Sequence, residues 1–342
     1  MKVLALLVVA AIGLGVAAWA LFVPQRPPPN GPHPVGRTEL NLRAPDGQPI
    51  AATVWYPSGA TPTASAPLIL YSPGWGGRRW QSSILAESLA SRGFVVVGCD
   101  DYANDPATDP DRGVSLDLSS DAATASTLER AGRHVETQAS RLLAVLRALA
   151  DGQSPFLAGR VDLTRVGILG YSIGGAAGLQ AALLDSRIVA VANIDGGLFG
   201  PPASTIGTEA YFLISSREAF PPASELASTN PSIRNYALIS VADIPRNTLR
   251  MERPGSYWMQ LPAADHGDLS DALFAFSRAR LFRTNLERRA MNAAIVMHTA
   301  TFFDGALRGD DKAMRALVGR NDQTVRWISS TSTPPGTASA RQ

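Results

Sequence analysis

Hydrophobic and polar positions alternate along two early stretches of the chain. Residues 38–42 and 51–56 place apolar and polar side chains in turn, as half-buried strands do, and Ala-Pro-Asp-Gly at 44–47 favours a turn between them. These stretches predict an antiparallel pair of strands. Later apolar runs are continuous, which is the pattern of strands buried on both faces. They cover residues 67–71, 94–98, 166–169, 188–192, 211–214 and 257–261.

Helical periodicity fills the chain between most of these apolar runs. It predicts helices over residues 81–91, over a stretch that ends at 151–152, and over 176–183 and 290–307. Strands that alternate with helices indicate a mostly parallel sheet wrapped by helices on both faces. We therefore expect an α/β domain over residues 38–328.

Two internal stretches break this alternation. Residues 103–130 are polar and acidic without a clear period, and we expect them to cross the functional edge of the sheet before the next helix begins. Residues 219–255 contain several prolines, which interrupt regular structure. This second stretch is a candidate cap or lid over a binding site.

The two ends of the chain lack the globular pattern. Residues 3–23 carry no charge, and as a helix they would span about 30 Å, the thickness of a bilayer core. Residues 1–24 are therefore interpreted as a signal peptide or a membrane anchor, two alternatives that stay open because Ala18-Trp19-Ala20 fits a cleavage site. Residues 25–37 read as a proline-rich linker, and 329–342 as a disordered tail.

Composition narrows the partners and cofactors. The chain has 342 residues, 45% of them apolar, and its net charge of +2 comes with no dense basic cluster, so we expect no nucleic-acid partner. The single cysteine, Cys99, excludes an internal disulfide, and its place after an apolar run favours a buried thiol. Zinc-binding, nucleotide-binding and dinucleotide-binding motifs are missing, so we expect no metal and no cofactor.

A candidate nucleophile lies between the apolar run at 166–169 and the small-residue helix that follows it. The intervening Gly170-Tyr171-Ser172-Ile173-Gly174 fits a nucleophile elbow, a sharp strand-to-helix turn that projects a serine hydroxyl into open space. Such a turn brings strand and helix close together, and Gly170 and Gly174 leave room for that approach. The pattern predicts that Ser172 is a nucleophile.

The same turn supplies a candidate charge stabiliser. The N–H of Ile173 would stand at the start of the helix, where an unpaired donor and the helix dipole face a developing oxyanion. The glycine-rich loop at 72–77 follows another buried strand and lets its backbone N–H groups approach a ligand. It is a natural second half of an oxyanion hole.

A serine nucleophile needs a base, which is most often histidine. His266 follows the strand at 257–261 through a short loop, and side chains placed there reach the carboxyl edge of the sheet, where ligands bind. The other histidines are His33 in the linker, His134 near the start of a helix remote from strand ends, and His298 within a helix. We expect these three to be surface or packing residues.

The acid that orients the base should lie between the serine and the histidine in the chain. Asp195 ends the apolar run that reaches Ile194 and precedes two glycines, which fits a turn at the same edge as the elbow. Glu218 follows the next strand and could also present a carboxylate there. The residues alone leave both open.

These features resemble the platelet-activating-factor acetylhydrolase family of serine esterases and, more distantly, the dienelactone-hydrolase branch of the α/β-hydrolases. The resemblance covers residues 38–308. This chain departs from the family at two positions. The family usually has histidine where this chain has Pro73, and many relatives have histidine where it has Tyr171. The resemblance is carried by three segments, Gly170-Tyr171-Ser172-Ile173-Gly174-Gly175, Ile194-Asp195-Gly196-Gly197 and Phe212-Leu213-Ile214-Ser215-Ser216-Arg217-Glu218.

The resemblance implies an α/β-hydrolase fold with a Ser-His-Asp triad. Ser172 would be the nucleophile, His266 the base and Asp195, preferred to Glu218, the orienting acid. The backbone N–H groups of Trp75 and Ile173 would form the oxyanion hole.

The function so implied is a calcium-independent carboxylic-ester hydrolase that forms an acyl-enzyme and acts outside the cytoplasm. Its expected substrates are short-chain or phospholipid-type esters. The protein itself would associate with a membrane through residues 3–23. Alternatives are an exported lipase or polyester-hydrolase-like enzyme, and a peptidase or acyltransferase with the same residues. A non-catalytic, membrane-tethered binding protein of the same fold also remains open.

Overall fold

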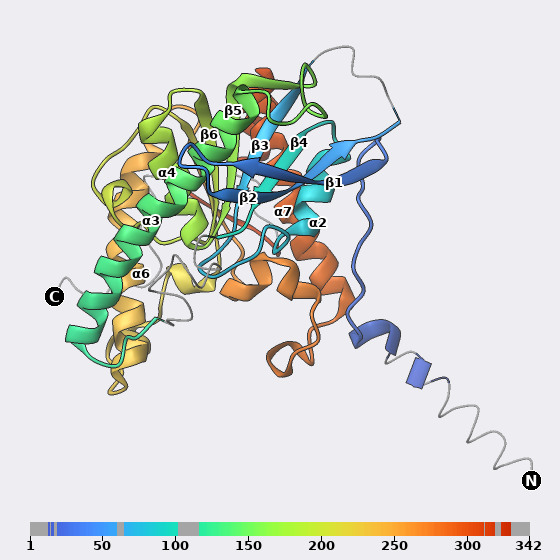
Figure 1. Ribbon diagram of the computed structural model, residues 1–342. Helices are drawn as coiled ribbons and strands as arrows, with labels where there is room; N and C mark the ends of the chain where they lie inside the picture. The colour runs from blue at the N-terminus through green and yellow to red at the C-terminus, as the bar shows by residue number, and fades with distance from the viewer. Residues whose placement is uncertain are drawn as a thin grey trace, which may run out of the picture.

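A nine-stranded sheet forms the centre of the computed structural model (Figure 1). The structure describes residues 19–59, 65–101, 116–310, 312–318 and 323–329, together with 13, 15 and 16. Its strands are β1 (Val35–Arg43), β2 (Pro49–Pro57), β3 (Ala66–Ser72), β4 (Val95–Cys99), β5 (Val161–Tyr171), β6 (Ile188–Ile194), β7 (Ala210–Ser215), β8 (Tyr257–Gln260) and β9 (Arg326–Ile328).

The sheet is parallel at its centre and antiparallel at both ends. The strand order is β1-β2-β4-β3-β5-β6-β7-β8-β9, and the pairs from β4 to β8 are all parallel. β1 and β2 form the expected antiparallel pair, and β2 also pairs antiparallel with β4. β9, which the apolar pattern did not predict, pairs antiparallel with β8. The predicted mostly parallel α/β sheet is confirmed.

Helices cover both faces of this sheet, as the alternating pattern predicted. α3, α4 and α6 pack on one face with alternate strand residues such as Leu68 and Leu70, and α2 and α7 pack on the other with Ile69 and Tyr71 (Figure 1). The α-helices numbered here are α2 (Ser83–Ala90), α3 (Asp121–Ala150), α4 (Ile173–Leu184), α5 (Ala223–Leu226), α6 (Pro231–Met251), α7 (Asn285–Arg308) and α8 (Lys312–Leu317).

The two stretches that broke the pattern are more helical than expected. α3 begins at Asp121, where the Ser120 side chain accepts a hydrogen bond from the Ala123 N–H at 3.1 Å, so 121–130 are helix and not an irregular excursion. Residues 102–115 lie outside the described residues. Within 219–255, α6 begins at Pro231, which needs no N–H partner there, and continues through Pro245. Because proline usually interrupts regular structure, the sequence pattern did not predict this helix of 21 residues.

The proline-rich segment lies against the domain rather than standing away from it. The Gln25 N–H donates to Asn285 Oδ1 at 3.3 Å, Arg26 pairs with Glu87, and β1 begins at Val35, inside the expected linker. Most of the expected signal peptide or anchor (1–12, 14, 17 and 18) and residues 330–342 of the expected tail lie outside the described residues. No helix within the described residues is both long and apolar enough to cross a membrane.

Candidate active site

Ser172 stands on the sharp turn that its flanking glycines predicted. It lies between β5 and α4 with φ 55° and ψ −133°, a backbone conformation that side-chain-bearing residues rarely adopt. A Cβ added to Gly170 would collide with the backbone of Gly174, and one added to Gly174 would collide with the backbone of Ser72. Only glycine fits at these two positions, because strand, turn and helix meet there without room for a side chain.

Ser172, His266 and Asp195 form one hydrogen-bonded line. His266 Nε2 lies 3.1 Å from Ser172 Oγ, and His266 Nδ1 lies 2.7 Å from Asp195 Oδ2. Asp195 Oδ1 accepts the Ser216 N–H at 2.7 Å, which fixes the carboxylate. Because Nδ1 faces a carboxylate, it carries the ring proton, and Nε2 is left to accept the proton of the serine hydroxyl.

The surroundings of His266 tune its basicity. Burial lowers the pKa of His266, but the hydrogen bond to Asp195 and the charges of Asp195 and Glu218 raise it, and the net shift is upward. Tyr171 stacks on the imidazole with ring centres 5.1 Å apart, and its hydroxyl donates to the His266 carbonyl at 3.1 Å. Burial raises the pKa of Tyr171 to about 12, so this phenol stays neutral. Tyr171 therefore holds the His266 ring and backbone in place and stays protonated itself.

Glu218, the rival acid, is close to His266 but does not contact the imidazole. Its Oε1 accepts the His266 backbone N–H at 3.3 Å, and its Oε2 accepts the Tyr236 hydroxyl at 2.7 Å. Asp195 alone of these two carboxylates meets Nδ1. The residue types left open whether Asp195 or Glu218 contacts the His266 ring, and the structure places Asp195 there.

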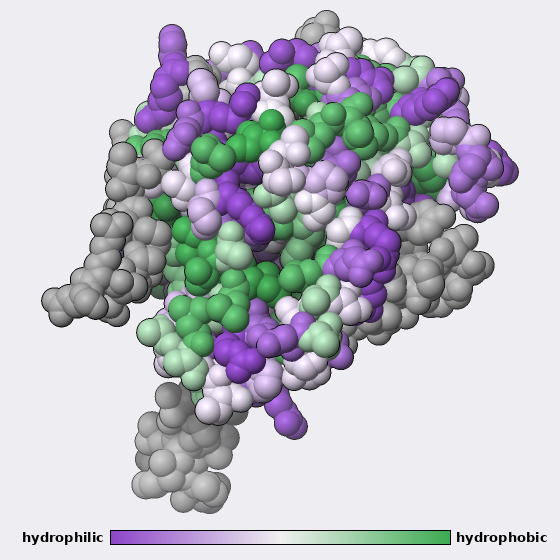
Figure 2. Space-filling view, turned by 90° about the vertical axis from the view of Figure 1, so that its left-hand side faces the viewer, coloured by the Kyte–Doolittle hydropathy of each residue, from purple (hydrophilic) through white to green (hydrophobic). Residues whose placement is uncertain are grey.

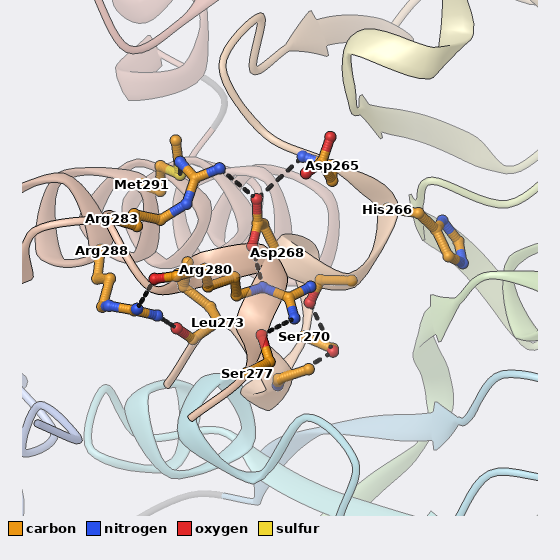
Figure 3. A network of polar contacts seen from close by, with 12 residues as sticks. Asp265, His266, Asp268, Ser270, Leu273, Ser277, Arg280, Arg283, Arg288 and Met291 are labelled. Carbon is orange, nitrogen blue, oxygen red and sulfur yellow. Dashed lines mark hydrogen bonds and ion pairs between the residues drawn. The ribbon is translucent and has the colours of Figure 1, made fainter. Parts of the chain in front are cut away.

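A buried charge network fixes the turn that carries His266 (Figure 3). Asp268 has no exposed surface, and its two carboxylate oxygens pair with Arg280 at 2.5 Å and Arg283 at 2.7 Å. Its Oδ2 also accepts the Asp265 N–H at 3.0 Å, which closes the short turn around His266. Figure 3 shows the imidazole pointing away from this network. Charged loop residues have no periodicity, so the sequence pattern does not predict this support.

The loop expected to complete the oxyanion hole lies over the elbow. The Gly74 N–H donates to Gln81 Oε1 at 3.0 Å, and the Gly76 N–H donates to Asp101 Oδ2 at 2.6 Å. Between them, the N–H of Trp75 has no hydrogen-bond partner among the described residues. The two neighbouring bonds hold the loop and leave this one donor available.

Ile173 offers a second N–H beside Ser172. As the first residue of α4, it has no acceptor within the helix for its own N–H. A Cβ on Gly74 would lie 3.2 Å from the Ser172 Cβ, so the loop before Trp75 is in close reach of the serine. The two expected donors, from Trp75 and Ile173, line the same cavity as Ser172.

His134 packs against the loop that carries Trp75, contrary to the expectation that it is remote from strand ends. α3 is long enough that His134 lies near its middle, buried, with Nε2 2.9 Å from Oδ1 of Asp101, which follows β4 by two residues. Its ring stacks on Trp75, with centres 4.8 Å apart and planes 14° from parallel. The expected packing role holds for His298, which is buried in α7 with Nδ1 against the Ala294 carbonyl.

A cavity of about 510 Å³ opens beside Ser172. α6, β7 and β8 form part of its wall, with apolar side chains such as Leu213, Ile239 and Trp258, and loops at the carboxyl edge of the sheet form the rest. Glu218 and Asp243 also face it, and its described lining contains no arginine or lysine. Such a cavity favours a neutral, apolar group over an anion.

Metal binding has no support within the part of the chain that the structure describes. No group of three or more histidine, cysteine, aspartate or glutamate side chains gathers there in a way that would hold an ion. Cys99, the single cysteine, is buried at the end of β4, as expected.

The chain is similar to known hydrolases in sequence and in fold. A family model described as PET hydrolase-like matches residues 28–196. A probable 1-alkyl-2-acetylglycerophosphocholine esterase from Arthroderma benhamiae is 30% identical over 143 residues, which span 41% of this chain but 33% of that relative. A ferulic acid esterase from Streptomyces cinnamoneus superposes with a TM-score of 0.62 at 22% identity, over 90% of this chain and 100% of that structure. The α/β-hydrolase fold and the resemblance to α/β-hydrolase esterases are confirmed.

Proposed function

We propose that this protein is a serine carboxylic-ester hydrolase with Ser172, His266 and Asp195 as its triad. The observation that carries the proposal is the unbroken hydrogen-bonded line from Ser172 Oγ through both imidazole nitrogens to Asp195. A strained elbow accompanies it, together with two backbone N–H groups that have no partner among the described residues, and a purely structural serine needs neither. The matched family and relatives, all hydrolases or esterases by description, support the same reaction class.

The geometry allows acyl transfer in two steps. Ser172 Oγ attacks the ester carbonyl carbon while His266 Nε2 takes the hydroxyl proton, and the imidazolium then protonates the departing alcohol. Water attacks the acyl-enzyme next, with the same nitrogen as base, which releases the acid and restores the serine. Asp195 holds the ring tautomer throughout. The N–H groups of Trp75 and Ile173 stabilise the oxyanion, and loss of one such donor costs about 3 kcal/mol.

For the substrate, we favour short-chain or phospholipid-type esters with an uncharged acyl group. The cavity beside Ser172 is largely apolar and carries carboxylates rather than basic groups, so it would repel an anionic acyl group. The partial match to an acetylglycerophosphocholine esterase supports this class. A polyester-hydrolase-like enzyme is the second candidate, and the PET hydrolase-like match favours it.

We also propose that the protein acts outside the cytoplasm, either exported or held at a membrane. The uncharged run at residues 3–23 supports this placement.

An ester panel tests the substrate proposal. p-Nitrophenyl esters from acetate to dodecanoate, matched amides and a polyester film would be compared with wild type and Ser172→Ala. We expect the highest kcat/KM on short neutral acyl esters, with the amides and the variant inactive. Preference for the film would favour the second candidate, and equal activity of the variant would exclude Ser172 as nucleophile.

A further inference from the structure

Large apolar side chains are exposed to water where the N-terminal segment meets the beginning of α7. Phe276, Phe282 and Leu286 are 74%, 85% and 77% exposed, and Trp19 and Phe22 lie exposed on the N-terminal segment. We call these five residues the apolar surface. Isolated exposed apolar residues are ordinary, but several large ones in one region mark an interaction site.

Hydrogen bonds bring the two parts of the apolar surface together. The Asn285 side-chain amide donates to the carbonyl oxygens of Ala20 and Val23, both at 2.8 Å, and Asn285 is the immediate neighbour of Leu286. Figure 1 shows the N-terminal helical turn and the orange segment before α7 at the same lower edge of the molecule. The end of the uncharged run is thus held against Asn285, next to the exposed Leu286 and a few residues along the chain from Phe282.

The segment 276–288 has the reverse of the usual polarity. Three of its four arginines turn inward, since Arg280 and Arg283 pair with buried Asp268, and Arg288 is buried against the carbonyl oxygens of Leu273 and Arg280 (Figure 3). Meanwhile its phenylalanine side chains point into solvent. In water this arrangement is unfavourable, because arginine prefers exposure and phenylalanine prefers burial. It becomes favourable when the outer surface meets an apolar medium.

The occupant that fits best is a lipid bilayer. The uncharged run at 3–23 leads directly to the apolar surface. Tryptophan prefers the zone between acyl chains and headgroups, and phenylalanine and leucine are typical of the apolar face of segments that lie in that zone. Residues 276–290 contain five arginines and one acidic residue, and Arg278 and Arg289 remain exposed. These two can meet anionic headgroups.

We propose that the apolar surface inserts into the outer zone of a bilayer with anionic headgroups. Asp268 links this surface to the His266 turn, so docking places the carboxyl edge of the sheet, with Ser172, close to the lipid. The α3–α6 side also carries exposed apolar side chains among hydrophilic ones (Figure 2), so the docking surface is selected by its contact with the uncharged N-terminal run and not by exposure alone. Docking is separate from the proposed esterase reaction, because it can be measured without any turnover.

A fluorescent probe on the full chain tests the docking directly. Cys99 is buried and burial raises the pKa of its thiol to about 11, so a cysteine introduced by Phe282→Cys can be labelled selectively with a polarity-sensitive nitrobenzoxadiazole dye. The matched control is Leu184→Cys, an exposed leucine at the far end of α4, on the edge of the sheet away from Ser172. Vesicles would contain phosphatidylcholine alone or with an equal part of phosphatidylglycerol.

The proposal predicts that the dye at position 282 brightens several-fold, shifts to the blue and is quenched by spin-labelled lipid, most strongly with anionic vesicles. The dye at position 184 should respond to neither vesicle. If protein sediments with vesicles while both dyes stay equally unquenched, the N-terminal run alone holds the membrane and the proposal is wrong. A dimer in ultracentrifugation that Phe282→Ser disrupts, with no lipid quenching, would instead assign the surface to a second copy.

Discussion

The contact between His134 and Asp101 can be removed without touching Ser172, His266 or Asp195. In His134→Phe, the aromatic ring can keep its stack on Trp75, while the hydrogen bond to the fully buried Asp101 side chain is lost. Asp101 then keeps its bond to the Gly76 N–H but loses the partner that orients it. The expected defect is a less well positioned Trp75 donor.

The structure sets the size of this effect. A hydrogen bond to a charged group contributes about 1.5–3 kcal/mol, so the free energy of unfolding should fall by about 2 kcal/mol in His134→Phe. Complete loss of an oxyanion donor costs about 3 kcal/mol in the transition state, and a displaced loop should lose about half of that. We therefore expect kcat to fall about tenfold, with KM nearly unchanged because the donor acts on the transition state.

The assay separates positioning from simple loss of folded protein. Both kcat and KM would be measured on p-nitrophenyl acetate, well below the melting temperature, with active sites counted by fluorophosphonate titration. His134→Gln serves as the conservative variant, because its side-chain amide can still donate to Asp101, and it should recover most of kcat. Unchanged kcat in His134→Phe, or no recovery in His134→Gln, would refute the positioning role.

Three further outcomes follow from the same site. Asp195→Asn should lower kcat about 10⁴-fold and Glu218→Gln far less, and the reverse ranking in steady-state kinetics would make Glu218 the orienting acid. Because neutral His266 is the proposed base and its pKa is raised, kcat/KM should fall as the pH drops through a value above the ordinary 6.5. Glu218→Gln removes one of the charges that raise this pKa, so the acid limb should move to lower pH, and an unmoved limb would contradict the assigned charge effect. Asp268→Asn should lower the free energy of unfolding by about 3–5 kcal/mol in urea titrations, since it removes the buried carboxylate that pairs with Arg280 and Arg283, and an unchanged midpoint would count against that network.

Local sequence patterns predicted the sheet and the elbow because both depend on neighbouring residues. Buried parallel strands need continuous apolar runs, and a strand-turn-helix elbow needs glycines two positions from the serine. The close approach of Gly170 and Gly174 to neighbouring backbone confirms that requirement. His266 could be singled out because it alone of the four histidines follows a predicted strand.

Contacts between distant residues could not be predicted in the same way. Asp101 and His134 are 33 positions apart, and their pairing depends on the length of α3, whose polar first turns lack an apolar period. Asp195 and Glu218 both follow strands that end at one edge, so only side-chain direction decides which of them meets the imidazole. The folded backbone supplies that direction through the strained φ of 55° at Asp195.

The most direct test of the proposed reaction is covalent labelling of the full-length protein with a fluorophosphonate, followed by intact mass measurement and peptide mapping. We expect one label per chain, on Ser172, and almost none in a folded His266→Ala variant. No labelling of a well-folded wild-type protein, or equal labelling in His266→Ala, would contradict the activated serine and favour a non-catalytic binding protein of the same fold.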